Sequence, residues 1–126
     1  MERLSGEIVV AQYKTGKYIG EVLERKEEQH LTLVKVLAVV THPTQGDLHH
    51  PKQTNVALFH QRRALAQFEK AWMPSHTVKP YHDEVPTYIE SLQKAINTQI
   101  EELELMDSDW AKLSLEQLKG LESEYF

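Results

Sequence analysis

Alternation of hydrophobic and polar residues predicts β-structure in the first third of the chain. The stretch GEIVVAQYKTGKYIGEVLER is rich in β-branched and aromatic residues and is broken only at Lys14–Lys17. Because glycine tolerates the positive φ of a tight turn, Gly16 favours a β-hairpin that turns at these four residues. After the polar KEEQ segment, HLTLVKVLAVV predicts a third strand, long enough to be bent or bulged.

Shorter apolar runs continue the β-pattern up to residue 82. They are NVALFH, RRALAQF and HTVKPY, the last of which is stopped by Pro80. Short antiparallel strands in so small a unit bury one face and cover their edges best when they curl into a barrel. We therefore expect a fold that is mainly β with α, in which residues 1–82 form a small SH3-like β-barrel.

The period of the hydrophobic pattern changes after Pro86, which suits the first turn of a helix. Apolar residues then recur every three or four positions and predict one amphipathic helix, with a stripe formed by Ile89, Leu92, Ile96, Ile100 and Leu103. Ser108 or Asp109 can cap a second helix. Because the connection is short, residues 83–126 should form a C-terminal α-helical hairpin, packed on the barrel so that the stripe is covered.

Charge divides the chain at the same place. Residues 1–82 carry 11 Lys and Arg against 8 Asp and Glu, whereas residues 83–126 carry 3 against 11, so the two parts have net charges of +3 and −8. The 126 residues include no cysteine, which excludes disulfides, a thiol nucleophile, a cysteine zinc site and a thioether-linked lipid. No signal-like start or run of 18 apolar residues occurs, so we expect a cytoplasmic protein without direct membrane insertion.

The segment HPTQGDLHHP, residues 42–51, is a candidate metal site by composition alone. Zinc needs three or four convergent ligands, yet His42 and His49 are seven positions apart in a loop, and no regular spacing brings them together. His49 and His50 are neighbours, which point in opposite directions in an extended chain. We therefore expect no metal and no cofactor.

The same segment has features of a docking loop. Pro43 and Pro51 restrict φ at its two ends and Gly46 permits a tight turn between them, so its shape is specified. Nothing nearby supplies an activated nucleophile or a positioned base. We expect its polar side chains to lie at the surface and to bind a protein partner.

Arg62 and Arg63 form the only adjacent arginine pair. They could hold a carboxylate or phosphate, or they could pair with the acidic helices. No Walker loop, GxGxxG, GxSxG or HExxH motif occurs, so we do not expect an enzyme. The sequence pI of about 5.8 does not favour a nucleic-acid partner.

Several motifs together resemble the kinase-associated protein B family of spore-forming bacteria. They are YKTGKYIGEV, VKVLAV, HPTQGDLH, PKQ, RRALA, VKPY and SLEQLKGLESEYF, and they run from about Gly6 to Phe126. The resemblance implies an accessory factor that a membrane-bound sporulation histidine kinase needs to feed the phosphorelay that starts sporulation. It also implies an SH3-like barrel followed by a helical portion. Members are sometimes labelled lipoproteins, a label that does not fit a sequence without cysteine.

The resemblance supplies no catalytic residues, so the candidate site is a partner-binding surface. Its candidate residues are His42, Gln45, Asp47, His49, Arg62 and Arg63. The expected partner is a protein, either the membrane sporulation histidine kinase or a component of its pathway, which could recruit this chain to the inner face of the cell membrane. The alternative is a small-ligand or metal sensor that uses the histidine-rich loop.

Overall fold

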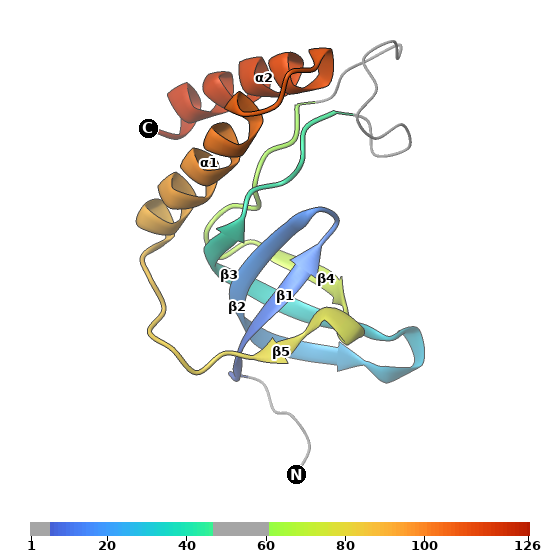
Figure 1. The fold of residues 1–126 in the computed structure, drawn as a ribbon. Helices are drawn as coiled ribbons and strands as arrows, with labels where there is room; N and C mark the ends of the chain where they lie inside the picture. The colour runs from blue at the N-terminus through green and yellow to red at the C-terminus, as the bar shows by residue number, and fades with distance from the viewer. Residues whose placement is uncertain (1–5, 47–60) are drawn as a thin grey trace.

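The computed structural model describes residues 6–46 and 61–126, which form an antiparallel sheet followed by two helices (Figure 1). The strands are β1 (Ile8–Tyr13), β2 (Gly16–Lys26), β3 (Leu31–Thr41), β4 (Lys70–Pro74) and β5 (Lys79–Pro80), and the helices are α1 (Tyr88–Glu104) and α2 (Asp109–Tyr125). In the sheet the strands lie in the order β4-β3-β2-β1-β5. Short 3-10 turns, η1 (Glu27–Gln29) and η2 (Ser75–Thr77), precede β3 and β5.

The predicted hairpin is β1–β2, but its turn differs from the prediction. Lys14 takes the positive φ, 54°, whereas Gly16 is the first residue of β2 and pairs with Tyr13. A Cβ on Gly16 would lie 2.5 Å from the Tyr18 hydroxyl. Gly16 is therefore needed for close packing against Tyr18 rather than for the conformation of the turn.

The pairing of β2 with β3 confirms the long, irregular third strand. Its register shifts at three points along β2, so the sheet bends there. Gly20 lies at one of these points, where a Cβ would be 2.4 Å from the Val34 side chain and 2.5 Å from the Lys35 carbonyl oxygen. The missing side chain lets the two strands approach each other closely.

The predicted fold class, mainly β with α, is confirmed, with two differences in the sheet. Its two edge strands, β4 and β5, form no ladder with each other in the described residues, so the five-stranded sheet is not closed. The RRALAQF run forms no strand, and β4, which follows it, was not predicted. The NVALFH run lies outside the described residues.

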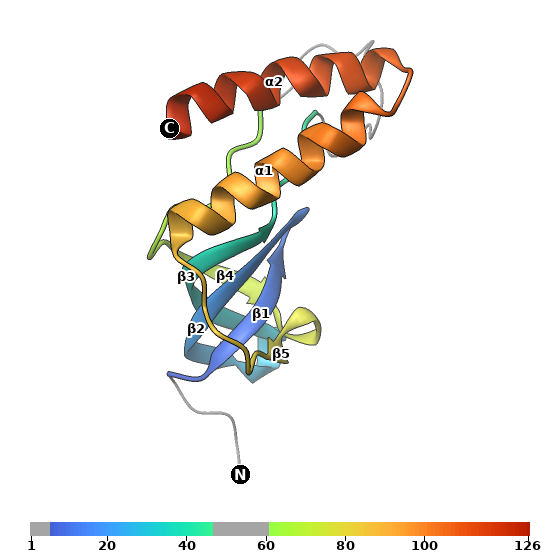
Figure 2. The same ribbon diagram turned by 60° about the vertical axis from the view of Figure 1, so that its left-hand side comes forward.

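Side-chain hydroxyls define the start of each helix. Thr87 caps α1 by accepting a hydrogen bond from the Glu90 amide. Pro86 therefore lies one residue before the cap, whereas the sequence predicted it in the first turn of the helix. Ser108 caps α2 in the same way through the Ala111 amide, as predicted. Figure 2 shows the two helices running back along each other, which confirms the antiparallel hairpin.

Helix α1 shares an apolar core with the sheet on one side and packs against α2 on the other. Leu92 and Ala95 of α1 belong to the same buried cluster as the sheet residues, and this cluster crosses the expected boundary between residues 82 and 83. Ile96 and Leu103 pack instead against α2, in a second cluster. Ile89 departs from the predicted stripe because it is 53% exposed.

Leu92→Ala should lower the free energy of unfolding by about 2–4 kcal/mol, because it leaves a cavity in the core between α1 and the sheet. Leu92 is 2% exposed. Ile89→Ala is the matched control on the same helix and should change the free energy by no more than about 0.5 kcal/mol. Urea denaturation of both variants measures the difference, and equal effects would show that α1 does not depend on this contact.

Candidate functional site

An irregular segment, residues 61–66, runs between the sheet and the helical hairpin (Figure 1) and is called the strap below. Irregular backbone near a core needs hydrogen-bond partners other than a neighbouring strand. In the strap, tyrosine side chains supply them.

Three tyrosine hydroxyls, from three different elements, hold the backbone of the strap. Tyr18 of β2 accepts a hydrogen bond from the Leu65 amide at 3.1 Å, and Tyr88 of α1 donates one to the Leu65 carbonyl oxygen at 2.5 Å. Tyr125, at the end of α2, accepts one from the Ala64 amide at 3.0 Å. The strap thus connects the sheet with both helices.

These tyrosines act through neutral hydroxyls. Burial raises the pKa of Tyr18 and of Tyr88 to about 12, and it also raises the pKa of Tyr125. All three therefore keep their protons at neutral pH. Their role is to donate and accept hydrogen bonds, not to act as bases.

The amide group of Gln45 fixes the strap at Arg62. Its Nε2 donates to the Arg62 carbonyl oxygen and its Oε1 accepts from the Arg62 amide, both at 2.9 Å. The Arg62 side chain returns a hydrogen bond from Nε to the Gly46 carbonyl oxygen at 3.0 Å. Residues 42–46 and the strap are therefore joined by both backbone and side-chain groups.

His42 connects the same segment with the end of α2. Its Nδ1 lies 3.1 Å from the Pro43 carbonyl oxygen and its Nε2 lies 3.0 Å from the Tyr125 hydroxyl. Burial lowers the pKa of His42, so the ring is neutral: Nδ1–H donates to Pro43, and Nε2 accepts from Tyr125. A metal ion could reach His42 only by displacing one of these partners.

The expectation that this polar segment lies at the surface is wrong for two residues. His42 is 1% exposed and Gln45 is 3% exposed. The physical reason is that their side chains satisfy backbone groups of two irregular segments that no strand covers. Asp47 and His49 lie outside the described residues. Two other members of this network, Tyr18 and Tyr125, could not be predicted from the sequence, because tyrosines also fit an ordinary core.

The two arginines have different neighbours. Arg63 pairs with Glu124 of α2, with Nη1 and Oε1 2.6 Å apart, and its guanidinium lies 5.3 Å from the centre of the Tyr125 ring. The expected pairing with the acidic helices is thus confirmed for Arg63. Arg62 instead binds the Gly46 carbonyl oxygen.

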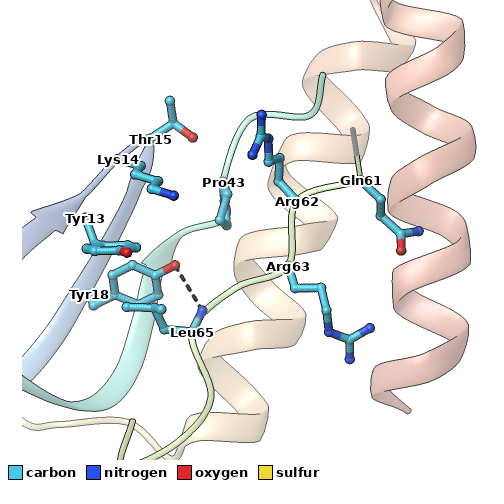
Figure 3. Close-up of a pocket in the computed structure, with 9 residues that line it drawn as sticks. All are labelled: Tyr13, Lys14, Thr15, Tyr18, Pro43, Gln61, Arg62, Arg63 and Leu65. Atoms are coloured by element: carbon cyan, nitrogen blue, oxygen red, sulfur yellow. Dashed lines mark hydrogen bonds between the residues drawn. The ribbon is translucent and has the colours of Figure 1, made fainter. Parts of the chain in front are cut away.

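A pocket of about 220 Å³ lies where the β1–β2 turn meets the strap (Figure 3). Its residues from the turn were not predicted from the sequence, because the chain order does not place them beside the arginines. The side chains that line it are those of Tyr13, Lys14, Thr15, Tyr18, Pro43, Gln61, Arg62, Arg63 and Leu65. Its charged groups are cations with hydrogen-bond donors, which suit the binding of an anionic group.

Two features of the described residues bear on other classes of function. Within residues 6–46 and 61–126, no three His, Asp or Glu side chains come together as a metal site would require. In the same ranges, neither helix is long and apolar enough to cross a membrane.

The fold and the site together define a small protein in which an open sheet and a helical hairpin hold a strap that carries two arginines, of which Arg63 is exposed. The family model described as "Kinase associated protein B" matches residues 13–126, and the chain belongs to this family. Membership indicates a role associated with a kinase.

Two relatives agree with this assignment. The chain is 52% identical to "Kinase-associated lipoprotein B" of Bacillus subtilis (strain 168), over 97% of this chain and 94% of the relative. The crystal structure of kinase-associated protein B from Bacillus cereus matches with a TM-score of 0.82 and 40% identity, over 98% of both chains. The name of the first relative includes the word lipoprotein, whereas the 126 residues here contain no cysteine that could carry a thioether-linked lipid.

Tyr125→Phe should lower the free energy of unfolding by about 1–3 kcal/mol, because it keeps the ring but leaves His42 and the Ala64 amide without their partner. Tyr81→Phe is the matched control, since its hydroxyl binds the Glu84 carbonyl oxygen at an exposed position. The control should change the free energy by no more than about 0.5 kcal/mol. Thermal or urea unfolding compares the two, and an unaffected Tyr125→Phe variant would contradict the role of the hydroxyl.

The stability of the protein should fall as the pH decreases below about 6.5, the ordinary pKa of histidine. The folded state holds His42 neutral, so the unfolded chain binds a proton at a higher pH than the folded one does. One such site changes the free energy of unfolding by at most about 1.4 kcal/mol per pH unit. The free energy of unfolding measured between pH 7.5 and 5 should decrease as the pH falls, and His42→Gln should make this decrease smaller.

Proposed function

We propose that this protein is a non-catalytic accessory protein that binds a signalling partner and supports a sporulation sensor histidine kinase. In this proposal it acts in the cytoplasm, in the phosphorelay that initiates sporulation. Membership of the kinase-associated protein B family supports the association with a kinase. The partner is the kinase itself or a component of its pathway, which brings the protein to the inner face of the membrane.

The main support for the proposal is that the exposed Arg63 side chain extends from a strap whose backbone is held by hydrogen bonds. The strap backbone is bound by three tyrosine hydroxyls and by Gln45, whereas the Arg63 side chain is 52% exposed. Binding costs less when the backbone that presents a contact residue is already ordered. Arginine is also among the residues that contribute most at protein interfaces.

The candidate surface in this proposal contains Arg62 and Arg63, together with Asp47 and His49 from outside the described residues. His42 and Gln45 have a different role in this proposal. Because both are buried, they position the strap instead of presenting their own side chains to the partner.

The alternative, a sensor that binds a metal or small ligand through the histidines, has less support. Both ring nitrogens of His42 already have hydrogen-bond partners. No described contact favours a ligand there over the Pro43 and Tyr125 groups that hold the ring.

The exposed ion pair of Arg63 and Glu124 offers a matched test of the docking surface. Arg63→Ala should weaken capture of the kinase or its pathway partner at least about fivefold, which corresponds to the loss of about 1 kcal/mol at an interface. Glu124→Ala removes the same ion pair but leaves the guanidinium free, so it should preserve capture. Each substitution should change folding stability by no more than about 1 kcal/mol, because surface ion pairs contribute little.

The measurement is crosslinking and recovery of each tagged variant from cells of a spore-forming host entering sporulation, with spore counts in parallel. Loss of capture and of spores with Arg63→Ala alone supports the proposal. Undiminished capture by folded Arg63→Ala would move the docking surface elsewhere. Normal sporulation of cells that lack the protein altogether would contradict the proposed function.

A further inference from the structure

The pocket at the β1–β2 turn has a lining of unusual charge for an acidic protein. Three of its residues, Lys14, Arg62 and Arg63, are cationic, and no carboxylate of the described residues lines it. The chain as a whole has a net charge of −5. Positive charge is therefore concentrated where the turn approaches the strap.

Two of the three cations have no carboxylate partner among the described residues. The Lys14 ammonium lies 5.5 Å from the centre of the Tyr13 ring, a neutral group that brings no negative charge. Arg62 donates its Nε hydrogen to the Gly46 carbonyl oxygen, and its terminal nitrogens are not used in that bond. Arg63 differs, since its charge is balanced by Glu124.

Two of the hydrogen-bond donors at the pocket, Arg62 and Thr15, are already held by contacts within the chain. Arg62 is fixed at its backbone by Gln45 and at its side chain by Gly46. Thr15 accepts a hydrogen bond from the Thr44 amide at 2.9 Å, which leaves its own hydroxyl hydrogen free to donate. Figure 3 shows Lys14 and Arg62 around Pro43, whereas the Arg63 side chain extends toward the helices.

We propose that this pocket binds a phosphate group. A phosphate monoester carries about −1.5 to −2 charges near pH 7 and several strong acceptor oxygens. These match a hydroxyl donor and two cations that have no carboxylate partner within residues 6–46 and 61–126. A carboxylate carries one negative charge and would leave one of the two cations unmatched. A guanidinium can also bind two oxygens of one phosphate through its terminal nitrogens.

This inference goes beyond the proposed function and does not depend on it, because the pocket could hold a phosphate whether or not the protein contacts a kinase. The phosphate could be a free anion or a monoester on a larger carrier. Either would present the same oxygens to Lys14, Thr15 and Arg62. The two sources are separated by the probes used in the test.

The test is an NMR titration of the ¹⁵N-labelled full chain with inorganic phosphate, O-phosphoserine and acetate at equal ionic strength. Both phosphate probes should shift the amide signals of Lys14, Thr15 and Arg62, and acetate should bind at least about tenfold more weakly because it carries less charge. Tighter binding of O-phosphoserine would indicate a carrier-borne group, and tighter binding of inorganic phosphate a free anion.

Variants test whether the two cations do the binding. Lys14→Gln should weaken phosphate binding about tenfold, since it removes one charge-assisted hydrogen bond. Lys14 is exposed in the turn, so this change should leave the melting temperature almost unchanged. Lys112→Gln, at an exposed position of α2, removes the same charge away from the pocket and should leave binding unchanged.

Three results would overturn the inference. The first is the absence of shifts at the pocket with either phosphate probe. The second is acetate binding as tightly as phosphate. The third is equal weakening by Lys14→Gln and Lys112→Gln, which would reveal a general effect of net charge. Arg62→Gln adds a second measurement if it folds, and Lys14→Gln decides the matter by itself if it does not.

Discussion

The hydrogen bonds from three tyrosine hydroxyls to the strap are the interaction on which the rest of the structure depends. The strap is irregular, and its amides and carbonyl oxygens lie between a sheet and two helices where no strand can pair with them. Tyr18, Tyr88 and Tyr125 supply the missing partners, one from each element that surrounds the strap. Because buried backbone groups are costly to leave unpaired, this arrangement requires the sheet and both helices to be in place together.

The helical hairpin therefore has a second structural role besides covering apolar surface. Leu92 and Ala95 complete the core of the sheet, while Tyr125 at the far end of the hairpin reaches His42 and Ala64. The polar segment after β3 is therefore enclosed by the last residues of the chain. This segment of mostly polar residues can be buried because its polar groups form hydrogen bonds with the hydroxyl and amide groups around it.

The same network explains how charged groups can be presented on a rigid surface. Arg62 is held by hydrogen bonds through its backbone and its Nε, and the Arg63 guanidinium lies near the Tyr125 ring, beside Glu124. Both arginines thus extend from a backbone that is already ordered. The hairpin turn brings Lys14 to the same place from the other side. The concentration of positive charge arises from two segments that are distant in sequence, the β1–β2 turn and the strap, in a chain that is acidic overall.

The sequence by itself determined the hairpin, the long bent third strand, the change from strands to helices near residue 86 and the antiparallel helical pair. These follow from hydrophobic period, turn residues and caps, which act over a few neighbouring positions. Local patterns could not reveal that RRALAQF forms no strand, that His42 and Gln45 are buried, or that Lys14 lies beside Arg62. Each of these depends on partners 17 to 83 positions away in the chain, or on contact between two loops. Only the tertiary structure decided them, because a polar side chain is buried or exposed according to whether distant groups can complete its hydrogen bonds.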